Sequence, residues 1–291
     1  MKNSDFTINI LTTDGPQYDY LIHMLEKTFI INVVIREPGK YQRKRLISNK
    51  KYYRYICNRY QWFSREVLGY NKYRKNYFNY EGALKSKIIN VTNINSNYVV
   101  NLLNQNPCNL CIVMGTSILK KKIINACKSE IINVHGGYLP YYRGNNCIYF
   151  AYLNDDWDRI ANTIHYIDTG VDTGDIIEIV RPTISSDDNP ETLYCKAKKL
   201  AIHKLIEIIK KYQSNEYIPR ISQDIHIGKQ YKTEERNVKT LLFITSSKSR
   251  ESSSRHKNRG YTDNHFLAIF TNEKMYLRYP FILTYPNYKR P

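Results

Sequence analysis

Short apolar runs alternate with amphipathic segments along most of the first 215 residues. Each apolar run has the length of a strand, and the segments between the runs place apolar residues at helical spacing, as Tyr20, Leu21, Met24 and Leu25 do. Strands that alternate with helices build a parallel sheet with helices on its faces. The chain is therefore predicted to form an α/β fold. Strands are expected at residues 6–11, 29–35, 87–91, 110–114, 130–134 and 176–180, and further helices at residues 97–104, 117–127 and 190–212.

Segments outside this alternation define the expected domain organisation. Residues 1–215 form the main domain, and a basic, Tyr-rich insertion at residues 41–79 within it is expected to be helical. An extended segment follows at residues 216–245. The Ser-rich and basic residues 246–264 predict a flexible linker, because they offer almost no apolar surface to bury. Alternation returns in residues 265–291, which predict a small tail with a hairpin.

The balance of charge favours an anionic partner. The chain has 44 Lys and Arg against 26 Asp and Glu, a formal net charge of +18. Solvated lysines without a function are the alternative explanation. Aromatic residues in the insertion could stack on bases while its cations meet phosphates, although packing contacts are the commoner role for aromatics at this spacing. The sequence has no apolar run that could span a bilayer, no signal peptide and scattered cysteines, so no membrane partner and a cytoplasmic location are expected.

Two glycine-punctuated motifs carry residues suited to proton transfer and oxyanion stabilisation. Asn133 and His135 lie two residues apart at the end of an apolar run, so the strand period of two places both side chains on one side. An amide and an imidazole can both donate to an oxyanion if a carboxylate orients the imidazole. Asp172 is the strongest candidate for that carboxylate, with Asp168 and Asp175 as rivals in the same turn. Each motif alone could be a structural turn, but their joint occurrence, with a βαβ-like interval between them, favours a site.

The combined motifs resemble a known family. Asn133-x-His135, Leu139-Pro140-x-x-Arg143-Gly144 and Asp168-x-Gly170-x-Asp172-Thr173-Gly174-Asp175 are similar to the signature of the folate-dependent formyltransferases. The resemblance implies a Rossmann-like catalytic domain with a mostly parallel sheet, the formyltransferase fold, followed by a short C-terminal extension. It also implies an enzyme that transfers a formyl group from 10-formyltetrahydrofolate to a primary amine, with no metal.

The resemblance assigns roles to individual residues. Asn133 and protonated His135 would stabilise the oxyanion, and Asp172 would accept or relay the proton. Residues expected to line the folate pocket are Val113, Met114, Gly115, Thr116, Ser117, Ile118, Ile167, Asp168 and Gly170. Residues expected to contact the acceptor are Gly136, Tyr138 and Arg143.

The acceptor is the open question at this point. The run from Thr163 to Asp168 and the short C-terminal extension look most like enzymes that formylate nucleotide-linked amino sugars, which makes such a sugar the preferred acceptor. Methionyl-tRNA is the alternative, because basic and aromatic residues of the insertion could grip an acceptor stem. A second alternative is a non-catalytic member that binds folate or a nucleotide. A homodimer is compatible with each of these.

Overall fold

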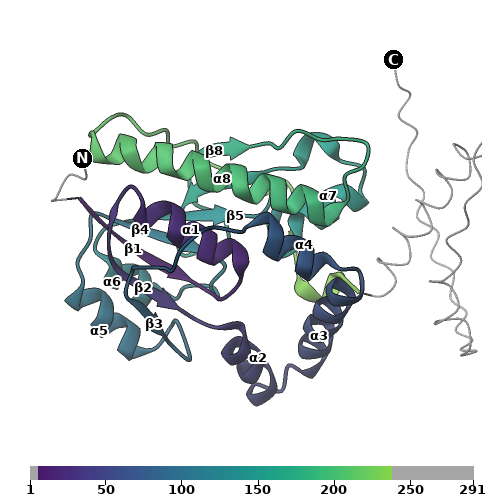
Figure 1. The fold of residues 1–291 in the computed structure, drawn as a ribbon, viewed down its shortest axis with the longest axis horizontal. Coiled ribbons are helices and arrows are strands. Elements are labelled where there is room, and N and C mark those ends of the chain that lie inside the picture. Colours follow the sequence, from purple (N-terminus) through teal and green to yellow (C-terminus); the bar gives the residue numbers. More distant parts are fainter. Residues whose placement is uncertain (1–5, 238–291) are drawn as a thin grey trace, which may run out of the picture. The chain divides into compact units, whose positions relative to one another are not determined.

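A seven-stranded mixed sheet forms the centre of the protein (Figure 1). The computed structural model describes residues 6–237, so the predicted linker at 246–264 and the predicted tail at 265–291 lie outside the described residues. The strand order is β3-β2-β1-β4-β5-β7-β8. The strands are β1 (Thr7–Thr12), β2 (Ile30–Arg36), β3 (Ile88–Asn90), β4 (Leu110–Met114), β5 (Glu130–His135), β7 (Asn162–Tyr166) and β8 (Ile176–Val180).

Helices cover both faces of the sheet, as the alternating pattern predicted. On one face, α1 (Pro16–Glu26) and α8 (Pro190–Gln213) pack in a core cluster with Ile8, Ile10 and Ile112 of the strands. On the other face, α5 (Asn97–Gln105) and α6 (Lys121–Cys127) pack in a second cluster with Leu11 and Val113. Because neighbouring strand residues point to opposite faces, the central strands β2, β1, β4 and β5 contribute to both clusters.

The parallel part of the sheet brings the carboxyl ends of five strands to one edge. β1 pairs in parallel with β2 and with β4, β2 pairs in parallel with β3, and β4 pairs in parallel with β5. Thr12 is therefore aligned with Met114, and Val113 is aligned with Asn133. Ligands of such sheets bind beyond the carboxyl ends of the strands. The end of β5, where Asn133 and His135 lie, is at this edge.

Two expectations from the sequence were wrong, one about the interval between the two motifs and one about the start of helix α6. The interval between the two motifs is not βαβ-like, because β7 runs antiparallel to β5 and β8 antiparallel to β7. The short elements between β5 and β7 are β6 (Tyr142–Gly144), α7 (Cys147–Leu153) and the 3-10 turn η1 (Trp157–Arg159), and they do not return the chain to the start of a parallel strand. Helix α6 begins at Lys121 and not at Ser117, whose backbone N–H donates to the buried Glu37 carboxylate.

The basic insertion is helical, as predicted. It forms α2 (Gly39–Ser48), α3 (Tyr52–Val67) and α4 (Tyr70–Tyr77). Its aromatic side chains differ in burial, because Tyr73 packs against the core whereas Trp62 and Phe63 are exposed. Packing therefore accounts for only part of the aromatic content.

The expected extended segment contains a short strand, β9 (Lys229–Tyr231), followed by the 3-10 turn η2 (Thr233–Glu235). Strand β9 pairs in parallel with β6, in a small second sheet. The Gln61 side chain of α3 donates to the carbonyl oxygens of Thr233 and Arg236. The segment thus connects the insertion to the loop that follows β5.

Local capping fixes the start of the longest helix. Asn189 caps α8, and its side chain accepts from the backbone N–H groups of Glu191 and Thr192. The sequence offers both Asp188 and Asn189 as caps before Pro190, and in the structure Asn189 has this role. Within residues 6–237, no helix has both the length and the apolar content needed to cross a membrane.

Candidate active site

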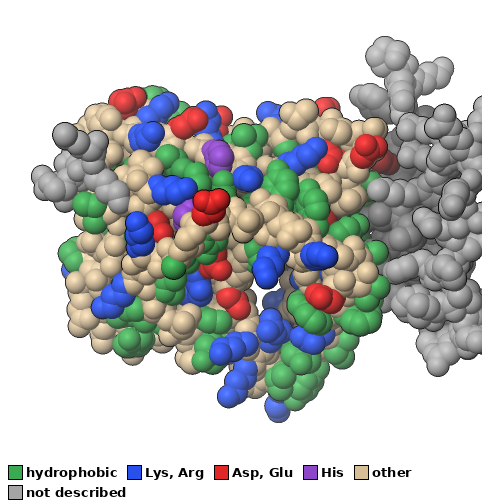
Figure 2. Space-filling view, in the orientation of Figure 1, with side chains coloured by type: hydrophobic (Ala, Val, Ile, Leu, Met, Phe, Trp, Pro, Cys, Tyr) green, Lys and Arg blue, Asp and Glu red, His purple; other side chains and the backbone are tan. Residues whose placement is uncertain are grey.

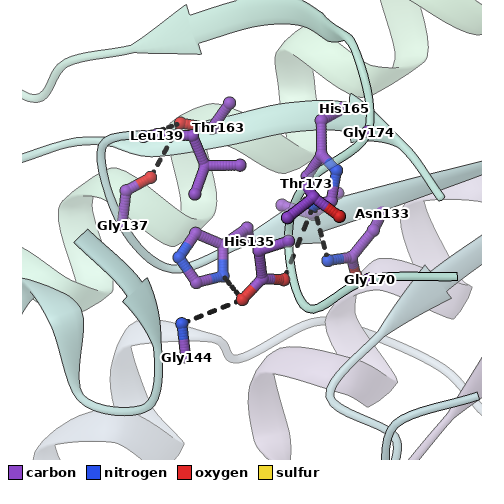
Figure 3. Close-up of polar contacts among 12 residues, drawn as sticks. Asn133, His135, Gly137, Leu139, Gly144, Thr163, His165, Gly170, Thr173 and Gly174 are labelled. Atoms are coloured by element: carbon purple, nitrogen blue, oxygen red, sulfur yellow. Dashed lines mark hydrogen bonds and ion pairs between the residues drawn. The ribbon is translucent and has the colours of Figure 1, made fainter. Parts of the chain in front are cut away.

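Asn133 and His135 lie at the carboxyl end of β5 (Figure 3), and the carboxylate of Asp172 lies beside the His135 ring. In the antiparallel pair of β5 and β7, Asn133 is opposite His165 and His135 is opposite Thr163. Both sequence motifs therefore meet across a single pair of strands. The convergence of the amide, the imidazole and the carboxylate that the spacing predicted is present.

A second histidine orients the amide. The Asn133 side chain lies 3.0 Å from Nε2 of His165, and the Nδ1 atom of His165 lies 2.7 Å from the carbonyl oxygen of Tyr166. Burial lowers the pKa of His165 to about 4, so the ring is neutral at pH 7. A neutral ring that donates from Nδ1 to a carbonyl must accept at Nε2. Asn133 therefore donates one amide hydrogen to His165 and retains a second one.

His135 is held between a carbonyl and a carboxylate. Its Nε2 donates to the carbonyl oxygen of Tyr142 at 2.9 Å, and its Nδ1 lies 3.3 Å from Oδ2 of Asp172. Both ring nitrogens therefore face acceptor oxygens of the protein. His135 is 6% exposed, so its contacts with the protein fix the position of the ring.

Asp172 has several partners from distant parts of the chain. Its Oδ2 also accepts from the backbone N–H of Gly144 at 2.9 Å, and Oδ1 lies 3.7 Å from Nε2 of His165. The latter contact is not an ion pair, because His165 is neutral. Asp172 has a φ of 55°, in the left-handed region that Asp tolerates better than most residues. The tight turn and the contacts of the Asp172 carboxylate with Gly144 and His135 hold this conformation.

The loop after His135 depends on a close approach at Gly137. A Cβ atom on Gly137 would lie 2.5 Å from the carbonyl oxygen of Tyr142 and 2.7 Å from Nε2 of His135. Thr163 fixes the same loop, since its hydroxyl donates to the carbonyl oxygen of Gly137 at 2.7 Å and accepts from the N–H of Leu139 at 3.1 Å (Figure 3). Glycine is required here because a backbone carbonyl occupies the space of a side chain.

Asp168 does not compete with Asp172 for the imidazole. Its carboxylate accepts from the N–H of Gly170 at 3.0 Å and from the hydroxyl of Thr173 at 2.7 Å. These bonds close the turn that carries Asp172. Asp168 therefore has the role of a turn residue in this geometry.

Residues expected in the folate pocket have different surroundings. The side chains of Val113 and Met114 are 3% and 1% exposed and pack in the two core clusters. Ile118 is 65% exposed, whereas the Ser117 hydroxyl accepts from Arg45 at 3.0 Å. Gly115 has a φ of 81° and turns the chain at the end of β4, before the half-buried Thr116. Ile167 packs against the cluster that includes Val113.

Residues expected to contact the acceptor lie around the loop after β5. Arg143 belongs to β6, pairs with Gln230 of β9, and has a buried Nε atom without a hydrogen-bond partner among residues 6–237. The Tyr138 hydroxyl accepts from Arg181 at 3.1 Å. Gly136 lies between two buried polar side chains, since a Cβ atom there would be 3.8 Å from Oδ1 of Asn162 and 3.9 Å from Nζ of Lys198.

Lys198 is a buried cation behind the site that the sequence did not indicate. It lies on α8, is 4% exposed, and donates to the carbonyl oxygen of Val134 at 3.3 Å. Burial, followed by the positive charge of Arg74, lowers the pKa of Lys198 to about 8, while Asp172 acts in the opposite direction. Lys198 therefore adds positive charge near the carboxylate that holds His135.

The described residues 6–237 contain no cluster of three or more His, Cys, Asp or Glu side chains that could hold a metal ion. The polar groups at the site are instead those of amide, imidazole and carboxylate chemistry. Their arrangement can donate hydrogen bonds to an oxygen that gains negative charge and can accept a proton nearby.

The sequence is similar to that of known formyltransferases. A family model described as "Formyl transferase" matches residues 27–209. The methionyl-tRNA formyltransferase of Finegoldia magna is 31% identical over 127 residues, which are 43% of this chain and 41% of that relative. The chain thus matches less than half the length of that relative.

Solved structures share the fold at low sequence identity. The phosphoribosylglycinamide formyltransferase of Anaplasma phagocytophilum has a TM-score of 0.52 at 17% identity, covering 76% of this chain and 97% of that one. A sugar 3N-formyl transferase solved in the presence of dTDP and 5-N-formyl-THF has a TM-score of 0.51 at 18% identity, covering 80% of this chain and 71% of that one.

Fold and site together define an α/β protein with the formyltransferase fold, in which a mostly parallel sheet presents an amide, an imidazole and a carboxylate at one edge. The family model extends this assignment to the sequence, because its match spans more than half of the chain. The chain belongs to the formyl transferase family.

Four contributors to the site were missed by reasoning from the sequence. They are His165, the carbonyl of Tyr142, the backbone N–H of Gly144 and Lys198. The one local signal that points to His165 is that it is a histidine inside an apolar run. The other contributions depend on which backbone groups the loop and α8 place beside β5, which no spacing rule provides.

Proposed function

We propose that this chain transfers a formyl group from 10-formyltetrahydrofolate to a primary amine. The observation that carries the proposal is the meeting of Asn133, His135 and Asp172 at the edge of the sheet, in a chain of the formyl transferase family. The three side chains come from two strands and a turn that are far apart in the sequence. A purely structural turn would not require all three chemical groups at one place.

The walls near the site fit a flat, partly apolar co-substrate. Ile167 packs against the core cluster that includes Val113 and Leu119, so this side of the site is apolar. Asp168 uses its carboxylate within its own turn, which leaves backbone groups of residues 167–172 to face a heterocycle. When bound, 10-formyltetrahydrofolate supplies the formyl group. Gly115, Thr116, Ile118 and Gly170 would border it from the two loops.

The side chains of the site have complementary tasks in this proposal. Asn133 donates its second amide hydrogen to the formyl oxygen as negative charge grows there, while His165 keeps the amide in position. His135 supplies a second donor by exchanging the Tyr142 carbonyl oxygen for the formyl oxygen. Asp172 holds the His135 ring and receives a proton from the attacking amine, directly or through water, and a proton is returned to the nitrogen of tetrahydrofolate as its bond to the formyl carbon breaks.

The acceptor is proposed from the relatives and from charge. The curated relatives at 30–31% identity are methionyl-tRNA formyltransferases, which supports methionyl-tRNA better than the nucleotide-linked amino sugar that the sequence analysis preferred. Such a sugar is the second candidate, because the partly buried Arg65 and Arg236 suit a compact phosphate group. The net charge of +18 suits both phosphate-bearing acceptors.

Formyl transfer is tested directly with purified protein, 10-formyltetrahydrofolate and a set of amine acceptors. The acceptors are Met-charged initiator tRNA and nucleotide-linked 3-amino and 4-amino sugars, and the readouts are tetrahydrofolate release and the mass gain of one formyl group. The proposal expects one acceptor to gain the group. Tetrahydrofolate release with none of them would favour a hydrolytic relative, and no release at all would favour a binding protein.

Variants of the site test the roles of its residues. Asn133→Ala and His135→Ala should each lower kcat by about a hundredfold or more, because each removes a donor to the oxyanion. Asn101→Ala, on the exposed side of α5, is the control and should retain wild-type kcat. Circular dichroism confirms that each variant is folded. Full turnover by His135→Ala would refute the assignment.

A further inference from the structure

Three arginines from separate segments gather at the start of α8. Arg65 comes from α3, Arg74 from α4 and Arg236 from the residue after η2. All three act electrostatically on one another or on Glu191, which lies in the first turn of α8 and has a side chain that is 5% exposed. We call Arg65, Arg74 and Arg236 the arginine cluster. None of the three belongs to the motifs that define the family resemblance.

Arg74 has a complete set of partners. Its Nε donates to Oε1 of Glu191 at 2.7 Å, and a second guanidinium nitrogen lies 2.5 Å from the same oxygen. Its guanidinium also lies over the ring of Tyr194, 4.4 Å from the centroid. The side chain is 17% exposed. Arg74 therefore occupies the carboxylate of Glu191 with its own hydrogen bonds.

Arg65 and Arg236 lack comparable partners. The Nε atom of Arg65 is buried without a hydrogen-bond partner among residues 6–237. Burial, together with the positive charges of Arg74 and Arg236, lowers the pKa of Arg65 to about 10. Arg236 donates to the side-chain oxygen of Asn146 at 3.2 Å and lies over the ring of Tyr149 at 4.3 Å, both of which are neutral partners.

The arginine cluster therefore carries more positive charge than its surroundings neutralise. Glu191 is the carboxylate named among the leading electrostatic effects on all three guanidinium groups, and of the three only Arg74 is hydrogen-bonded to it. Like charges held together and partly removed from water are unfavourable unless an anion joins them. An anion at this position would satisfy the free Nε of Arg65 and reduce the repulsion among the three side chains.

The chemistry of the arginine cluster favours phosphate. Guanidinium forks match the oxygen geometry of phosphate and can bind it with paired hydrogen bonds. Tyr60 and Tyr70 lie close enough to interact with Arg236, and burial raises the pKa of each, so their hydroxyls stay protonated and can donate. The arginines and these tyrosine hydroxyls can therefore donate hydrogen bonds to a phosphate. Glu191 is the carboxylate beside them that would compete with the phosphate for these donors.

Contacts connect the arginine cluster to the active site by two routes. Asn146, the partner of Arg236, is two residues beyond Gly144, whose N–H donates to Asp172. Along α8, Tyr194 contacts Arg74 and also lies 5.9 Å from the ammonium of Lys198. Figure 2 shows a hollow edged by Lys and Arg side chains between α2, α3 and α4. A ligand that entered beside the insertion could thus reach both regions.

We propose that Arg65, Arg74 and Arg236 bind a phosphate group of the acceptor substrate and thereby hold its amine at Asn133 and His135. This proposal rests on the proposed formyl transfer, and it names phosphate as the part of the acceptor that the insertion recognises. The phosphate could be the diphosphate of a nucleotide-linked amino sugar or a backbone phosphate of methionyl-tRNA. The same three side chains would serve either source.

Binding of inorganic pyrophosphate tests the arginine cluster without any turnover. Isothermal titration calorimetry of the full chain should show binding that Arg65→Gln weakens at least tenfold. Arg59→Gln is the matched control, because Arg59 is an exposed arginine of the same helix, and it should change the Kd less than twofold. Arg65→Gln should also melt at or above the wild-type temperature without pyrophosphate, since it removes an unpaired charge. No pyrophosphate binding by the wild type, or equal binding by Arg65→Gln, would overturn the proposal.

Kinetics then identify the source of the phosphate. With the acceptor that is formylated, Arg65→Gln should raise KM at least tenfold and change kcat less than twofold. A higher KM for the amino sugar assigns the arginine cluster to a diphosphate. A higher KM for methionyl-tRNA assigns it to a phosphate of the RNA backbone. An unchanged KM for the working acceptor would refute the proposal. If no acceptor is formylated, the proposed function fails while the pyrophosphate measurement still decides the anion site.

Discussion

Replacing Lys198 by Met should stabilise the protein at neutral pH. Lys198 is 4% exposed, and burial together with Arg74 lowers its pKa from 10.5 to about 8. At about 1.4 kcal/mol per pH unit, holding this side chain charged in the folded state costs about 3 kcal/mol below pH 8. Met has a similar length and removes the charge. It also removes the 3.3 Å hydrogen bond to the Val134 carbonyl, which is worth about 1 kcal/mol.

The expected net gain is about 2 kcal/mol at pH 7, and it should depend on pH in a defined direction. Between pH 8 and pH 10.5 the unfolded chain holds the Lys198 proton more tightly than the folded chain does. The Lys198 contribution to wild-type stability therefore rises with pH through this window. The advantage of Lys198→Met should shrink accordingly and largely vanish by pH 10.5.

Urea unfolding at pH 7 and pH 10, followed by circular dichroism, measures this difference between the variant and the wild type. Lys210→Met is the control, because Lys210 is an exposed lysine of the same helix and its replacement should change stability little at either pH. A Lys198→Met variant that is less stable than the wild type at pH 7 would refute the reasoning. An advantage that is equal at both pH values would also refute it, since the pKa difference would then not be its cause.

Two further substitutions test the geometry of the site and of α8. Gly137→Ala should lower the free energy of unfolding by about 1–3 kcal/mol and reduce kcat, because the added Cβ would lie 2.5 Å from the Tyr142 carbonyl oxygen and would displace His135. A variant with the urea unfolding and turnover of the wild type would contradict this expectation. Asn189→Ala should cost about 1 kcal/mol by removing the cap of α8, with kcat unchanged. Thermal unfolding and the transfer assay check this expectation, and a loss of turnover at wild-type stability would contradict it.

Elements with strong local signals were predicted well. Strand β4 covers the residues expected from its apolar run, and α8 begins at Pro190 as expected, with Asn189 as the cap where the sequence left Asp188 and Asn189 as alternatives. The insertion is helical. These features depend on periodicity, capping and conformational preference, which nearby residues supply. The start of α6 was misplaced because Ser117 contacts Glu37, a residue distant in the sequence.

The candidate site was predicted only in part. The spacing of Asn133 and His135 was enough to place both side chains on one side of β5, because a strand repeats every two residues. The sequence also favoured Asp172 over Asp168, and the hydrogen bonds of Asp168 within its own turn agree with that choice. It gave no means of placing His165 opposite Asn133, because that pairing requires the antiparallel register of β5 and β7.

The sequence by itself thus determined the α/β class, the strand that carries Asn133 and His135, and the family resemblance of the two motifs. Only the tertiary structure decided that β7 runs antiparallel, that Gly144 and His165 complete the site, and that Arg65, Arg74 and Arg236 meet at Glu191. The physical reason is the range of the interactions. Periodicity and capping act within a few residues, whereas strand register, burial and unneutralised charge depend on segments that only the folded chain brings together.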